Sequence, residues 1–195
     1  MSEPSDVIDV ISAKIVVTGG FGVGKTTFVA AVSEIAPLTT EAVMTELSAG
    51  VDDLSGVTGK TTTTVAFDFG RITLGPDIVL YLFGTPGQDR FAFLWDDLVE
   101  GALGAMILVD TRRIEDCHPA LDYFEKADIP YAIGVNHFAG SRGFEKAEIR
   151  EALDVPDHVP VVYCDARDRS SVKETLIALL DAAMDAVRRR GSLGY

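Results

Sequence analysis

The sequence predicts a doubly wound α/β domain with a mostly parallel sheet and helices on both faces. Short apolar runs rich in β-branched residues recur along the chain, and several are apolar throughout, which is typical of strands buried on both faces. Helical patterns lie between these runs, so strand and helix alternate from end to end. The expected strands are 14–18, 64–69, 78–83, 105–109, 131–135 and 159–164.

Two amphipathic stripes predict helices that cover the sheet. The first stripe consists of Phe28, Val29, Val32 and Ile35, and the second of Val172, Leu176, Leu179, Ala183 and Val187. The second helix is expected to open with a capping box formed by Ser171 and Glu174. The segment 37–63 shows only weak periodicity, so no strong strand is predicted there, and a stretch of this kind is usually functional or disordered.

Length and charge restrict the function classes. A chain of 195 residues that is 47% hydrophobic suits one globular domain. Its formal charge of −13 disfavours a nucleic-acid partner, because a polyanion would be repelled. Two widely spaced cysteines suit a reducing cytoplasm, and no apolar run approaches the roughly 20 residues that span a bilayer. We therefore expect a cytoplasmic protein without direct membrane insertion.

A glycine-rich phosphate-binding loop follows the first expected strand. Residues 19–26 read GGFGVGKT, which fills every fixed position of the GxxxxGK[ST] pattern. Glycines let successive backbone amides point at phosphates, the lysine reaches the β and γ phosphates, and the threonine hydroxyl binds Mg²⁺. The alternative is a glycine-rich turn that binds nothing. The residues expected to contact the nucleotide here are Gly19, Gly22, Val23, Gly24, Lys25, Thr26 and Thr27.

A second glycine-bearing loop, residues 84–88, follows the expected strand 78–83 and should lie beside the first loop. Gly87 can offer its amide to the γ-phosphate, and Gln88 can orient the attacking water as the catalytic residue. A simple turn built on Pro86 and Gly87 is the alternative.

With both loops in place, the chain resembles the small Ras-like GTPases, and more closely the bacterial branch found in actinomycete conservons and related to the gliding-motility switch GTPases. Residues 82–91 (LFGTPGQDRF) and 108–113 (LVDTRR) are the stretches most distinctive of that branch. The resemblance implies one G-domain over 11–190, with a flexible N-terminus (1–10) and a tail (191–195). It also implies GTP, GDP and Mg²⁺ as ligands, and roadblock-type and histidine-kinase-like partners, through which any membrane recruitment would occur.

The resemblance assigns roles at matching positions. Thr26 would bind Mg²⁺, and Thr64, within a T-x-x-x-D-F stretch, would supply the second hydroxyl ligand of the metal, with Thr62 and Thr63 as rivals. The same threonine run can equally be a β-branched entry into a strand.

Two positions depart from the family pattern. The aspartate of the DxxG motif is replaced by Gly84, which should weaken metal binding and slow hydrolysis. The guanine-reading NKxD motif is replaced by NHFA, so Ala139 offers no carboxylate to the base.

The remaining base contacts would come from Asn136, His137 and the amide of Ala166, and Asp165 is a possible substitute carboxylate. The leading hypothesis is a slow GTP-hydrolysing switch. A catalytically weak nucleotide-binding scaffold and an ATP-binding P-loop protein are the alternatives.

Overall fold

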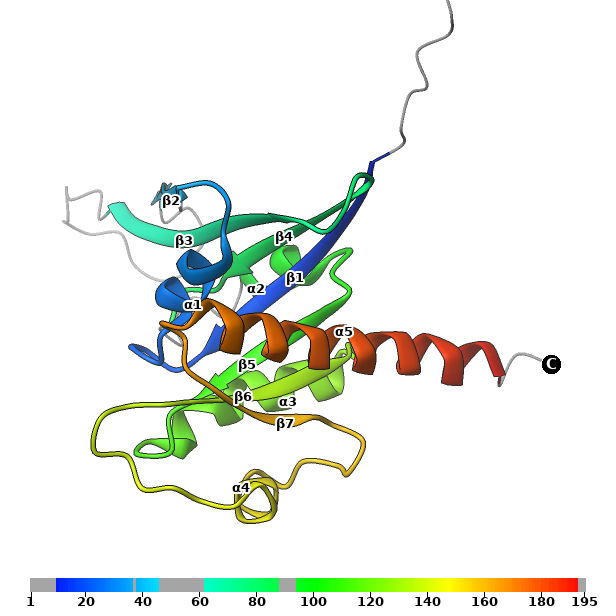
Figure 1. The fold of residues 1–195 in the computed structure, drawn as a ribbon. Coiled ribbons are helices and arrows are strands. Elements are labelled where there is room, and N and C mark those ends of the chain that lie inside the picture. Colours follow the sequence, from blue (N-terminus) through cyan, green and yellow to red (C-terminus); the bar gives the residue numbers. More distant parts are fainter. Residues whose placement is uncertain (1–9, 37, 46–61, 88–93, 193–195) are drawn as a thin grey trace, which may run out of the picture.

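A computed structural model of the chain describes residues 10–36, 38–45, 62–87 and 94–192. Its centre is a seven-stranded sheet in the order β2-β3-β4-β1-β5-β6-β7 (Figure 1). The strands are β1 (Ile11–Gly19), β2 (Leu38–Thr45), β3 (Thr62–Thr73), β4 (Ile78–Gly84), β5 (Gly104–Val109), β6 (Tyr131–Asn136) and β7 (Val161–Cys164). β1 pairs in parallel with β4 and β5, and the parallel ladder continues through β6 to β7.

Helices cover both faces of the sheet, which confirms the doubly wound prediction. On one face lie α1 (Lys25–Val32) and α5 (Arg169–Ser192); on the other lie α2 (Trp95–Val99), α3 (His118–Lys126) and α4 (Lys146–Leu153). Successive residues of β1 serve the two sides, because Ile15 and Val17 pack with the first layer and Val16 with the second. The short 3₁₀ turn η2 (Ile114–Cys117) leads into α3.

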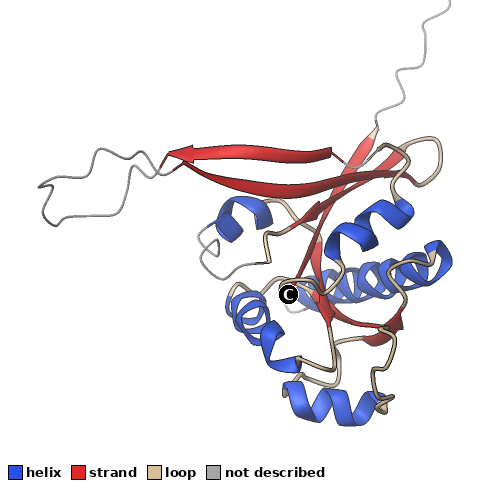
Figure 2. Cartoon of the chain, turned by 90° about the vertical axis from the view of Figure 1, so that its left-hand side faces the viewer, coloured by secondary structure: helices blue, strands red, loops and turns tan. Residues whose placement is uncertain are grey.

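The prediction of no strong strand in 37–63 is wrong for β2. This strand pairs antiparallel with β3 from Leu38 opposite Phe69 to Thr45 opposite Thr62, and β3 is itself antiparallel to β4. The two strands form the edge of the sheet that extends sideways beyond the helices (Figure 2). An edge strand needs a partner on one side only, so it can form from a sequence with a weak apolar pattern when β-branched residues are frequent.

The last residue of each predicted apolar stripe, Ile35 in the first and Val187 in the second, lies outside the core. α1 stops at Val32 with Ser33 as its C-cap, so Ile35 lies outside the helix. α5 is helical to Ser192, but Val187 is 67% exposed because the helix runs past the edge of the sheet (Figure 1).

The capping box predicted for α5 from Ser171 and Glu174 is wrong, because Asp168, three residues before Ser171, caps the helix instead. The helix begins at Arg169, and the Asp168 carboxylate accepts a hydrogen bond from the Ser171 amide at 2.9 Å. The Ser171 hydroxyl instead accepts from the amide of Asp165 in the preceding loop, also at 2.9 Å. Aspartate in the sequence just before the helix is an equally good cap, and it takes the role here.

Within the part of the chain that the structure describes, no helix is both long enough and apolar enough to cross a lipid bilayer.

Candidate functional site

The phosphate-binding loop connects β1 to α1 at the carboxyl end of the parallel strands. Gly22 and Gly24 have φ of 73° and 103°, in the left-handed region that a side chain would strain. A Cβ at Gly19 would lie 2.3 Å from the Leu108 carbonyl oxygen of β5. These positions therefore need glycine for the loop to curl between β1 and β5. Thr26 and Thr27 follow in the exposed first turn of α1, and the Val23 side chain is buried beneath the loop.

The Lys25 side chain is folded back into this loop. Its ammonium group donates hydrogen bonds to the carbonyl oxygens of Gly19 and Gly20, each at 2.8 Å. The residue is only 7% exposed, and burial lowers the pKa of the lysine to about 8, against a smaller opposing effect of the Asp68 charge. Lys25 is thus a desolvated cation at the position where a phosphate anion would neutralise it.

The loop after β4 lies against this lysine, as its position in the sequence predicts. A Cβ at Gly87 would lie 2.7 Å from the Lys25 ammonium nitrogen and 2.9 Å from the Cα of Phe21. A glycine is therefore needed for the close approach of the two loops. Gln88, the predicted catalytic residue, lies outside the described residues, so its role stays a prediction.

A carboxylate to which the sequence analysis gave no role, that of Asp68 in β3, reaches the site. Thr26 donates a hydrogen bond from its hydroxyl to Oδ2 of Asp68 in β3, at 2.7 Å. Asp68 faces Gly84 across the antiparallel β3–β4 ladder, and a Cβ at Gly84 would lie only 3.1 Å from the same Oδ2. The Asp68 carboxylate therefore lies beside the place from which the aspartate missing at Gly84 would project.

Asp68 was detectable in the sequence as the one acidic residue in the apolar run 64–69. What the sequence alone cannot supply is the register that sets it opposite Gly84, because antiparallel pairing between β3 and β4 depends on the whole hairpin.

The other predicted metal ligand, Thr64, lies in β3, and its role stays a prediction. Thr64 lies opposite Val43 of β2. It precedes Asp68 by four residues of extended strand, a distance of about 13 Å at the usual rise per residue. Among the β3 side chains that the structure describes, that of Asp68 accepts the hydrogen bond from Thr26.

The predicted base-contact residues meet behind the phosphate-binding loop. The buried Asn136 amide donates to the Val23 carbonyl oxygen at 2.9 Å, and its own oxygen accepts from the Ala166 amide at 3.0 Å. Asn136 and Ala166 therefore tie the loops after β6 and β7 to the phosphate-binding loop. His137 is exposed, and its amide donates to the Cys164 carbonyl oxygen at 2.7 Å.

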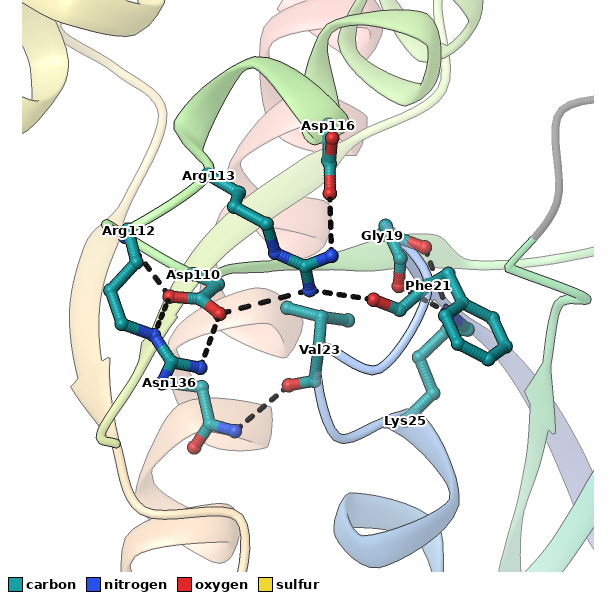
Figure 3. A network of polar contacts seen from close by, with 10 residues as sticks. Gly19, Phe21, Val23, Lys25, Asp110, Arg112, Arg113, Asp116 and Asn136 are labelled. Carbon is teal, nitrogen blue, oxygen red and sulfur yellow. Dashed lines mark hydrogen bonds and ion pairs between the residues drawn. The ribbon is translucent and has the colours of Figure 1, made fainter. Parts of the chain in front are cut away.

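An arginine that the sequence analysis gave no role holds the outside of the phosphate-binding loop (Figure 3). Arg113 donates to the Phe21 carbonyl oxygen at 2.8 Å and forms ion pairs with Asp116 at 3.4 Å and the buried Asp110 at 3.9 Å. Arg112 forms a bidentate pair with Asp110 and, with the other hydrogen bonds to that group, holds the pKa of the Asp110 carboxyl below its usual range. These contacts couple the end of β5 to the loop conformation.

A cavity of about 620 Å³ lies at the amino end of β6, at the end of the strands opposite to the phosphate-binding loop. It is lined by residues at the end of α3 and the start of β6, among them Phe124 and Tyr131. Ligands of open α/β sheets bind at the carboxyl ends of the strands, so the phosphate-binding loop, not this cavity, is the candidate site.

The fold and the site together define a P-loop NTPase-like protein with a G-domain fold. The chain belongs to the family described as "conserved hypothetical ATP binding protein", whose model matches residues 17–186. An uncharacterized protein of Methanocaldococcus jannaschii is 31% identical over 125 residues, which cover 63% of this chain and 68% of that protein.

Solved structures of G-domains share the fold. The FeoB G-domain of Methanococcus jannaschii matches with a TM-score of 0.59 at 14% identity, covering 89% of this chain and 98% of that one. The G domain of the T. maritima FeoB iron transporter matches with a TM-score of 0.61 at 17% identity, covering 89% and 99%. At these identities the likeness establishes the fold alone.

Proposed function

We propose that this protein is a nucleotide-dependent switch that binds GTP with Mg²⁺ at the phosphate-binding loop and hydrolyses it slowly to control partner binding. The observation that carries the proposal is the buried Lys25 ammonium group, which is held by loop carbonyl oxygens where a phosphate would bind. Burying a cation without a full countercharge costs free energy, and phosphate binding would recover it. The family relationship supports nucleotide binding independently.

The residues present fit a magnesium ion. Mg²⁺ prefers oxygen ligands and keeps several waters, so one or two protein oxygens beside a phosphate are sufficient. Thr26 would bind the ion directly through its hydroxyl, and Asp68 would hold it through water, in place of the carboxylate absent at Gly84. The 2.7 Å hydrogen bond between the two side chains supports this assignment, because it keeps both oxygens at one place before any metal arrives.

Hydrolysis is proposed to be slow. Of the arginines near the loop, Arg113 is engaged by Asp110, Asp116 and the Phe21 carbonyl oxygen, which leaves it unsuited to stabilise a transition state at the γ-phosphate. We retain Gln88 as the residue that orients water. Roadblock-type and histidine-kinase-like partners, expected from the resemblance to the conservon branch, remain part of the proposal.

ATP binding is the second candidate function. The family description names ATP, and Ala139 removes the carboxylate by which the NKxD motif selects guanine. A scaffold that binds nucleotide without hydrolysing it is a third reading, and it differs from both in releasing no phosphate.

Phosphate release tests the proposal. Nucleotide-stripped protein is incubated with GTP or ATP and Mg²⁺, and inorganic phosphate is followed under single-turnover conditions. We expect slow release that Lys25→Ala abolishes, while Lys173→Ala, which removes an exposed lysine of α5, leaves it unchanged. Equal release by the wild type and Lys25→Ala would overturn hydrolysis at this loop.

A further inference from the structure

The loops after β6 and β7 form the surface over which a base would lie. β6 and β7 end side by side, with Asn136 paired to Cys164, so the next residues, His137 and Asp165, are neighbours. A Cβ at Gly24 would lie 2.6 Å from the Asn136 side-chain nitrogen and 3.6 Å from the Ala166 Cβ. A nucleotide with phosphates in the loop therefore extends its base toward this pair of strand ends.

Asp165 places a carboxylate at these strand ends, and Arg167 binds both of its oxygens. Arg167 donates from Nε to Oδ1 and from Nη2 to Oδ2, both at 2.8 Å, and its backbone amide adds a bond of 3.0 Å to Oδ1. The two side-chain donors form a planar fork that binds both carboxylate oxygens at once. These bonds hold the pKa of Asp165 at about 2, so the group stays an ionised acceptor at neutral pH.

The guanine base presents the same pair of donors. Its N1–H and its exocyclic amino group lie side by side in one plane, as do the two N–H groups of the guanidinium fork. Adenine has an acceptor at N1 and cannot offer this pair. An ionised carboxylate that accepts two parallel N–H donors from Arg167 can accept the two parallel N–H donors of guanine in the same way. Adenine cannot form this pair of hydrogen bonds, and such matched polar contacts give strong discrimination.

The chain contains a second Asp–Arg pair with the same sequence spacing, Asp110 and Arg112, and this pair serves for comparison. Asp110 is bound by Arg112 in the same bidentate way, but Asp110 is only 3% exposed and the Arg112 guanidinium lies 4.2 Å from the centre of the Phe138 ring. Asp165 is 34% exposed, and Arg167 is 64% exposed. Arg112 is itself 45% exposed, so the two pairs differ in the burial of Asp110 and in the Phe138 ring against Arg112. The Asp165 pair is partly exposed on both side chains.

We propose that Asp165 is the residue that selects guanine in this protein, and that Arg167 occupies its carboxylate in the nucleotide-free state and is displaced by the base. This inference rests on the proposed function, because it requires a nucleotide with its phosphates at Lys25. Asp165 thereby replaces the carboxylate absent at Ala139. Arg167 lowers apparent affinity by competing for the carboxylate, without changing the contacts to the phosphates.

The test is a set of equilibrium titrations of the nucleotide-stripped full chain with GDP, IDP, ADP and XDP in the presence of Mg²⁺. IDP keeps N1–H but lacks the amino group, and XDP has an acceptor in its place. For the wild type we expect the order GDP, then IDP, then ADP, with GDP roughly tenfold to hundredfold tighter than ADP, since hydrogen bonds to an ionised group are the strong ones.

Two variants separate the roles. Asp165→Asn should lose most of the preference for GDP and bind XDP better than the wild type does, because the amide offers a donor to the xanthine oxygen. Arg167→Ala should bind GDP roughly threefold to tenfold tighter and leave ADP unchanged, as removal of a competitor requires. Asp157→Asn removes the same charge from an exposed turn and serves as the control that changes nothing.

The outcomes distinguish this inference from the proposed function. Guanine preference that persists in Asp165→Asn, or equal wild-type binding of GDP and ADP, overturns the role of Asp165 and leaves nucleotide binding at Lys25 standing. A failure of Arg167→Ala to tighten GDP overturns the competition by Arg167. Absence of binding for all four nucleotides overturns both proposals.

Discussion

At the scale of single residues, the polar side chains of the candidate site are hydrogen-bonded to neighbouring groups of the protein. Lys25 is buried on the carbonyl oxygens of Gly19 and Gly20, and Thr26 is paired with Asp68. The contacts of Lys25 satisfy a buried charged group that would otherwise be costly to desolvate, whereas the Thr26–Asp68 bond lies in an exposed part of the site. In the proposed switch, these groups would exchange these partners for phosphate and metal.

The buried lysine predicts a pH dependence of nucleotide affinity. In the free protein the Lys25 pKa is about 8, and a bound phosphate would raise it by favouring the charged form. Below pH 8 the lysine is already charged and affinity is at its maximum. Above pH 8 binding requires uptake of a proton, so affinity should fall by up to roughly tenfold per pH unit.

Isothermal titration calorimetry checks this at pH 7 and pH 9 in buffers with different ionisation enthalpies. We expect net proton uptake on binding at pH 9 and little at pH 7. Proton exchange and affinity that are the same at both pH values would contradict a role for Lys25 in contacting phosphate.

At the scale of elements, the sequence predicts what depends on local pattern and misses what depends on register. The parallel strands and their flanking helices follow from apolar runs and 3.6-residue periodicity, and the phosphate-binding loop follows from its fixed residues. β2 and the position of Asp68 opposite Gly84 depend on antiparallel pairing, which no single window of sequence encodes.

At the start of α5 the cap predicted from the sequence differs from the cap in the structure. The sequence pattern assigns the cap to Ser171 and Glu174, whereas in the structure the Asp168 carboxylate accepts the Ser171 amide. Asp168→Ala should therefore lower the free energy of unfolding by about 1 kcal/mol. Glu174→Ala should change it by less than about 0.5 kcal/mol, as for an ordinary surface position. Urea denaturation of both variants measures the difference, and a larger loss in Glu174→Ala would restore the capping box.

At the scale of the whole molecule, the sheet brings segments far apart in the sequence to one edge. The site takes Lys25 from the start of α1, Asp68 from β3, Gly87 from the loop after β4, Asn136 from the end of β6 and Ala166 from the loop after β7. Two apolar cores, one on each face, fix these loop positions. The sequence predicts which loops carry chemistry, and the fold determines which side chains in them meet.

The central claim is that phosphate and Mg²⁺ bind together at Lys25, Thr26 and Asp68. The most direct test is the affinity of the stripped protein for a non-hydrolysable GTP analogue with and without Mg²⁺, in the wild type, Asp68→Asn and the exposed control Asp122→Asn. We predict that Mg²⁺ tightens binding in the wild type and the control, and that Asp68→Asn loses this increase while keeping its metal-free affinity. A Mg²⁺ effect unchanged in Asp68→Asn, or no binding in the wild type, would contradict the claim.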